Sequence, residues 1–245
     1  MIWTFGDSFS KHFKPSKYFR NLDDTWIERT ATILGHKVTS NSKPLLTLEH
    51  IYYNFNNIRQ KLQPEDIIII TVTNVDRRWF WKDTPLKILF LNEIEQNAVN
   101  KYKEFNDVQD IYFTNFLYNL NHITKKLNLH TIVLPCFPDG EQLVNSIKDN
   151  YDAIHFGNIA LGLVSGQEFK NDLDFSNLFK DDRVNHFCRD NHIILSDKVI
   201  ENIKNKTPID LTTGFKQNFY DDSISEDQLF DRIMSRLMRI KINRP

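Results

Sequence analysis

Short apolar runs that alternate with helical patterns constrain the fold of this chain more than any other feature. Ile2–Phe5 and Ile67–Val72 have strand length and consist mainly of apolar side chains, and residues 37–40 form a weaker run of the same kind. Helix-type spacing of apolar residues fills 24–34, which a glycine follows, and 47–62. Such alternation predicts βαβ units and a parallel sheet.

The same alternation continues through the rest of the chain. Helical patterns are found at 86–103, 108–126, 141–148 and 190–203, and strand patterns at 131–136 and 153–156. We therefore expect an α/β fold, a three-layer α/β/α sandwich around a mostly parallel, flavodoxin-like sheet.

A chain of 245 residues has the length of one large α/β domain, which we place at 1–205. Residues 206–245 are expected to form an irregular segment and then an amphipathic C-terminal helix. Packing of this helical extension on the domain is the simplest expectation. Contact with a second copy of the chain or with a partner is the alternative.

Charge and composition exclude several classes of function. The net charge of −1 creates no field that would attract nucleic acid, and no apolar run is long enough to span a bilayer. No secretion signal is evident, so a cytoplasmic location and two free thiols, Cys136 and Cys188, are expected. Scattered histidines predict no metal site, and without a glycine-rich phosphate loop no cofactor is expected.

The first strand runs directly into the turn Gly6-Asp7-Ser8. In open α/β sheets the ligand binds outside the carboxyl ends of the strands, which is where a nucleophile belongs. Ser8 is therefore the candidate nucleophile. The alternative is a turn serine that caps the next helix.

A second candidate block precedes the helical pattern at 190–203. His186 follows two acidic residues, Asp181 and Asp182, within a polar segment. A histidine placed there can accept the serine proton while a carboxylate fixes its tautomer, in the chain order Ser, Asp, His. The alternative for His186 is a surface histidine.

With both blocks present, the chain resembles the SGNH (GDSL-type) hydrolases, whose first block is Gly-Asp-Ser after strand one. Their last block is Asp-x-x-His, often with a second histidine six residues on, and His186 and His192 have that spacing. The resemblance implies that Asn74, after strand Ile67–Val72, is the oxyanion asparagine. It also implies one backbone amide near Leu45 and the amide of Ser8 as further oxyanion donors.

The chain departs from the family pattern at two places. No glycine occurs in 41–47, where the family's second block supplies one, and Arg183 stands three residues before His186. Because alternate residues of an extended segment share a face, Asp182 rather than Asp181 is expected to orient His186. His192 is expected to pack or hydrogen-bond at the start of the closing helix, with Asp190 as the acid of its first turn.

An aromatic and basic run that includes Arg77, Trp79 and Trp81 follows Asn74 closely. These side chains can stack on a sugar or bind an anionic group, or they can pack beneath a loop. We predict a serine esterase that hydrolyses an acyl ester, preferably an O-acetyl ester of a carbohydrate, through Ser8, His186 and Asp182. The alternatives are an acyltransferase with the same site and a binding module of SGNH fold that has lost efficient catalysis.

Overall fold

The computed structural model describes residues 1–7, 9–10, 25–42, 47–73, 109–164 and 189–215. Within this part of the chain one five-stranded parallel sheet has the strand order β2-β1-β3-β4-β5. The strands are β1 (Ile2–Phe5), β2 (Val38–Ser40), β3 (Ile67–Val72), β4 (His130–Pro135) and β5 (Ile154–Phe156). This is the flavodoxin-like order, so the predicted fold class is confirmed.

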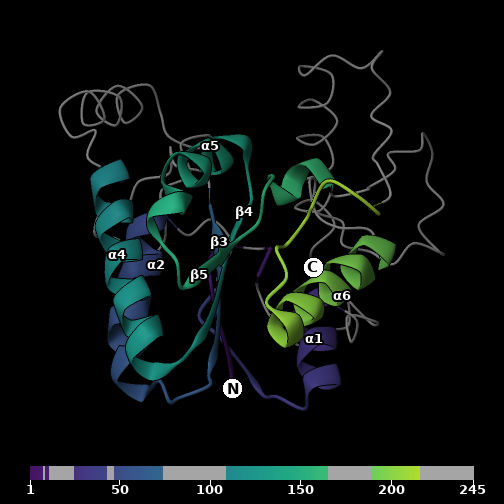
Figure 1. Ribbon diagram of the computed structural model, residues 1–245, viewed down its shortest axis with the longest axis horizontal. Coiled ribbons are helices and arrows are strands. Elements are labelled where there is room, and N and C mark those ends of the chain that lie inside the picture. Colours follow the sequence, from purple (N-terminus) through teal and green to yellow (C-terminus); the bar gives the residue numbers. More distant parts are fainter. Residues whose placement is uncertain (8, 11–24, 43–46, 74–108, 165–188, 216–245) are drawn as a thin grey trace, which may run out of the picture.

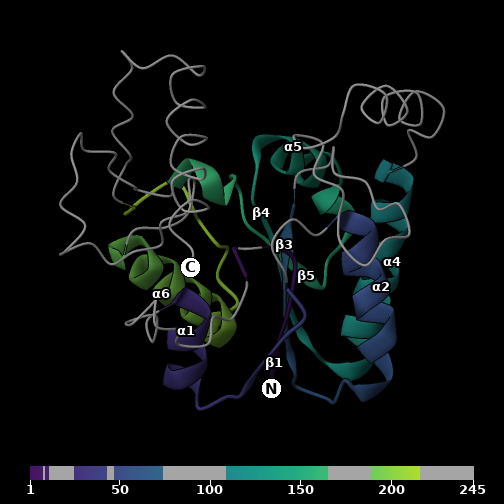
Figure 2. The ribbon, with the colours of Figure 1, turned by 180° about the vertical axis from the view of Figure 1, so that it is seen from behind.

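Helices cover both faces of the sheet (Figure 1). They are α1 (Trp26–Leu34), α2 (Leu48–Ile58), α4 (Gln109–Leu127), α5 (Pro138–Ile147) and α6 (Arg189–Asn205). Three short 3-10 turns, η1 (Arg59–Lys61), η3 (Lys148–Asn150) and η4 (Leu161–Val164), complete the described helical elements. Helices α2, α4 and α5 lie on one face, and α1 and α6 lie on the other, as the view from behind also shows (Figure 2).

Alternation of side chains along the strands produces two apolar layers. Ile68 and Ile70 of β3 point into the layer of α2 and α4, whereas Ile67 and Ile69 point into the layer of α1 and α6. All four are at most 3 % exposed. A strand that is buried on both faces is continuously apolar, which is why Ile67–Val72 is so distinct in the sequence.

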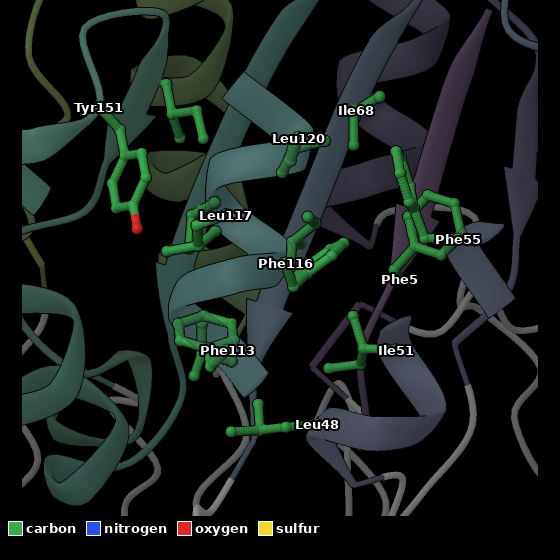
Figure 3. Packing of buried hydrophobic residues seen from close by; sticks show 14 of the residues in the cluster. Phe5, Leu48, Ile51, Phe55, Ile68, Phe113, Phe116, Leu117, Leu120 and Tyr151 are labelled. Carbon is green, nitrogen blue, oxygen red and sulfur yellow. The ribbon is translucent and has the colours of Figure 1, made fainter. Parts of the chain in front are cut away.

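Aromatic rings connect β1 to the helices of the first layer (Figure 3). The ring of Phe5 meets that of Phe55 at a centroid distance of 5.8 Å, and Phe55 meets Phe116 at 5.4 Å, both edge to face. Such pairs contribute about 0.5–1.5 kcal/mol each beyond the area they bury. The carboxyl end of β1 is thus fixed by rings from α2 and α4.

Local signals determine where α1 begins and ends. The hydroxyl of Thr25 accepts a hydrogen bond from the amide of Glu28, and Gly35 closes the helix with a φ of 68°. The predicted stop at Gly35 is confirmed, and the helix begins two residues later than predicted. Helix α5 begins at Pro138, three residues before the predicted start at 141. Proline is suited to the first turn of a helix, because the backbone N–H that it lacks would have no partner within the helix there.

Residues after α6 pack onto the domain. Ile209 forms a parallel bridge with Gly157, and Leu211 is fully buried in the layer of α1 and α6. The Oδ1 of Asn158 accepts the amide of Leu211 at 2.8 Å. The domain boundary at residue 205 stays a prediction, and the expected C-terminal helix lies outside the described residues.

Candidate active site

The turn after β1 depends on Gly6. Its φ of 140° lies in a region that L-residues rarely adopt. A Cβ at this position would lie 1.9 Å from the hydroxyl of Thr71 and 2.6 Å from its carbonyl oxygen. Glycine therefore allows the chain to turn in direct contact with the neighbouring strand β3.

Asp7 is fully buried directly after this glycine. Its Oδ1 accepts the amide of Phe9 at 3.0 Å and lies 3.7 Å from the thiol of Cys136. Its Oδ2 accepts the hydroxyl of Thr73 at 3.3 Å. A buried carboxylate is tolerated only where donors compensate for lost hydration, and these donors come from the segments that follow β1, β3 and β4.

A group of buried hydroxyls fixes the other end of the turn. Ser10 Oγ lies 2.6 Å from Thr71 Oγ1 and 2.8 Å from Ser42 Oγ. Ser42 in turn donates to the hydroxyl of Thr4 at 3.4 Å. Ser10 is thereby hydrogen-bonded to β3 on one side and to the segment after β2 on the other.

The topology of the sheet indicates that this turn lies at a ligand-binding position. β1 pairs with β2 on one side and with β3 on the other, so the chain leaves β1 toward β2 and leaves β3 in the opposite direction, toward β4. In sheets of this order the ligand binds at the carboxyl ends of the strands where the order reverses, here between β1 and β3. Ser8 follows Asp7 directly, and Asn74 follows Thr73 directly. The residues directly before both candidates therefore lie at the carboxyl ends of β1 and β3.

The predicted site residues themselves lie outside the described residues, and their roles stay predictions. They are Ser8, Leu45, Asn74, Arg77, Trp79, Trp81, Asp182 and His186, together with Asp181 and Cys188. The structure describes the neighbours of Ser8 on both sides, Asp7 and Phe9, and the residue before Asn74, Thr73.

The start of α6 is connected to the same turn. His192 Nδ1 accepts the amide of Trp26 at 3.2 Å, and the Trp26 indole donates to the carbonyl of Phe9 at 2.9 Å. Asp190 lies in the first turn of α6. The expectations that His192 bonds near the start of this helix and that Asp190 is its N-terminal acid are confirmed.

Both the sequence and the structure of the chain can be compared with those of known proteins. No protein-family model matches the sequence, and no curated protein matches it either. Solved structures that are similar to the chain include the following two.

One is a lipolytic protein of the G-D-S-L family from Desulfitobacterium hafniense DCB-2, 13 % identical, with a TM-score of 0.46 over 82 % of this chain and 97 % of that one. The other is the psychrotrophic esterase EstA from Pseudoalteromonas sp., 12 % identical, with a TM-score of 0.46 over 84 % of this chain and 97 % of that one.

Among the described residues, no group of three or more His, Cys, Asp or Glu side chains is arranged to hold a metal ion. The thiol of Cys136 is fully buried, 3.7 Å from Oδ1 of Asp7. In the part of the chain that the structure describes, no helix is both long and apolar enough to cross a membrane.

Sequence reasoning missed Thr73, Cys136 and the hydroxyls of Ser10, Ser42 and Thr71. Serine and threonine in strands and turns carry no local signal for a shared network. The one available signal was positional, because Thr73 and Ser42 follow predicted strands within two residues and Cys136 is the last residue of one.

Proposed function

We propose that this protein is a serine esterase that hydrolyses an acyl ester, with O-acetyl esters as the preferred class. The observation that carries the proposal is the Gly6-Asp7 turn, which is buried, hydrogen-bonded to Thr73 directly after β3, and located where the strand order reverses. An attacking group must be held in position, and Asp7, which directly precedes Ser8 in the chain, is itself held by hydrogen bonds from Phe9 and Thr73.

In this proposal Ser8 attacks the acyl carbon and His186 takes its proton, then returns it to the leaving alcohol. Asp182 holds the imidazole of His186 in the tautomer that can accept the proton. The negative charge on the tetrahedral intermediate is stabilised by the Ser8 amide, the Asn74 side chain and one amide near Leu45. Water then attacks the acyl-enzyme by the same route and releases the acid.

The substrate class we propose is an acylated carbohydrate. Trp79 and Trp81 supply aromatic faces on which sugar rings stack, and Arg77 supplies a donor for hydroxyl or anionic groups. Contacts of this kind act on a large substrate and not on a small ester.

Hydrolysis of p-nitrophenyl acetate tests the proposal. We expect Ser8→Ala to lower kcat by about 10⁴-fold or more, because removal of a triad member leaves only binding and oxyanion effects. Ser146→Ala, in the last turns of α5, is the matched control and should retain wild-type activity. Trp79→Ala should lower kcat/KM for an acetylated oligosaccharide much more than for p-nitrophenyl acetate.

Wild-type protein that hydrolyses neither ester would instead favour the binding module. Transfer of the acyl group to a sugar hydroxyl, faster than to water, would favour the acyltransferase. Unchanged activity of Ser8→Ala would overturn the role of Ser8.

A further inference from the structure

Two threonines, one in β3 and one directly after it, form hydrogen bonds with the turn after β1. Thr71 lies in β3 and Thr73 directly follows it, so the two alternate residues face the same side of an extended segment. Thr71 Oγ1 lies 2.6 Å from Ser10 Oγ, and the Thr73 hydroxyl donates to Asp7 Oδ2 at 3.3 Å. These contacts lie on either side of Ser8 along the chain.

The contact of Thr73 differs from that of Thr71 in what it connects. Asp7 is joined by a peptide bond to Ser8, and Thr73 is joined by a peptide bond to Asn74. Consecutive Cα atoms are about 3.8 Å apart, so the hydrogen bond joins the two segments one residue from each candidate group. Thr71 is three residues from Asn74 and connects to Ser10, on the far side of the turn.

The surroundings keep this contact in place. Asp7 and Thr73 are both fully buried, and Asp7 is further held by the amide of Phe9. Helix α5 packs closely behind Thr73, since a Cβ on Gly140 would lie 3.3 Å from the Thr73 carbonyl oxygen. Neither partner has space to shift without disturbing a strand end or a helix start.

We propose that Thr73 is a positioning residue of the esterase reaction, which acts through Asp7 to fix the segment of Asn74 relative to the turn of Ser8. The inference rests on the proposed function. An oxyanion donor must lie within about 2.7–3.1 Å of the developing charge, so a small relative shift of the two segments weakens transition-state stabilisation. A displacement of 1 Å can lower the rate by about 100-fold.

Thr73→Val tests this role, because valine keeps the shape of threonine and removes the hydroxyl. We expect kcat for p-nitrophenyl acetate to fall by about 10- to 100-fold while KM changes by less than about threefold, since positioning affects the transition state more than substrate binding. Thr73→Ser keeps the hydroxyl and should restore kcat to within about threefold of wild type. The acid limb of the kcat/KM pH profile should not move in either variant.

Thr124→Val is the matched control, because its hydroxyl lies 2.7 Å from that of Thr131 in a buried pair between α4 and β4. It removes the same chemical group at a site remote from the turn and should leave kcat unchanged. If Thr73→Val does not fold, Thr73→Ala, which needs no more space than threonine, takes its place.

The outcomes separate the two proposals. If Ser8-dependent hydrolysis is present and Thr73→Val equals wild type, the positioning role is overturned and the esterase stands. If Thr124→Val loses kcat as much as Thr73→Val, the effect is general destabilisation and the role is again overturned. If the wild type has no Ser8-dependent hydrolysis, the proposed function fails, and the role of Thr73 fails with it.

Discussion

At the scale of single residues, Gly6 shows how a backbone requirement and a packing requirement coincide. Its φ of 140° disfavours any side chain, and the space where a Cβ would stand is occupied by Thr71 of β3. Gly35 has a φ of 68° but no heavy atom within 4 Å of an added Cβ. The two glycines therefore separate the conformational effect from the steric one.

We expect Gly6→Ala to lower the free energy of unfolding by about 3 kcal/mol or more, because backbone strain and overpacking each contribute about 1–3 kcal/mol. Gly35→Ala should cost about 1–2 kcal/mol, the penalty of the left-handed conformation alone. Urea denaturation of the two variants measures the difference. Equal losses would mean that the contact of Gly6 with Thr71 contributes nothing to stability.

At the scale of elements, β4 and β5 are joined by a stacked histidine pair. The rings of His130 and His155 lie 4.6 Å apart with an interplanar angle of 11°, and His130 Nε2 is 2.7 Å from Oδ1 of Asn202 on α6. Burial lowers the pKa of His130, and the charge of Lys206 lowers it further. Together these effects outweigh the hydrogen bond to Asn202, which raises the pKa. Burial also lowers the pKa of His155, with further contributions from His130 and Lys206.

A lowered histidine pKa means that the folded state binds fewer protons than the unfolded state. The stabilisation is therefore complete above the ordinary pKa, near 6.5, and is lost as the pH falls toward the depressed values. We expect the free energy of unfolding to decrease between pH 7.5 and pH 5, and His155→Phe to reduce that slope.

The exposed His122 of α4 provides the control for this pH dependence. Denaturation of His122→Gln across the same pH range should reproduce the wild-type slope. A slope of His155→Phe that matches the wild type would show that the stacked pair does not couple protonation to stability.

At the scale of the whole molecule, the sheet could be predicted because its signals are local. Ile67–Val72 is apolar at every position except Thr71 and emerges as β3 with the predicted bounds, since burial on both faces favours apolar side chains. The start of α5 was predicted three residues too late, at 141, although Pro138 fits the first helical turn. Helix ends depend on single residues, and strands on runs of residues.

The candidate site could be predicted only in part. Gly6-Asp7-Ser8 is contiguous and follows a strand, so its position at a strand end followed from the sequence. The contacts of Asp7 with Thr73 and of Ser10 with Thr71 join residues 66 and 61 positions apart. Such pairs depend on which strands become neighbours and in which register, and no local pattern encodes that.

Covalent labelling with a fluorophosphonate probe, followed by identification of the modified peptide, tests whether Ser8 is the nucleophile. We predict one adduct on Ser8 in the wild type, formed at a rate that rises with deprotonation of His186, and no adduct in Ser8→Ala. An adduct on another residue of the wild type, or equal labelling of Ser8→Ala, would contradict this prediction.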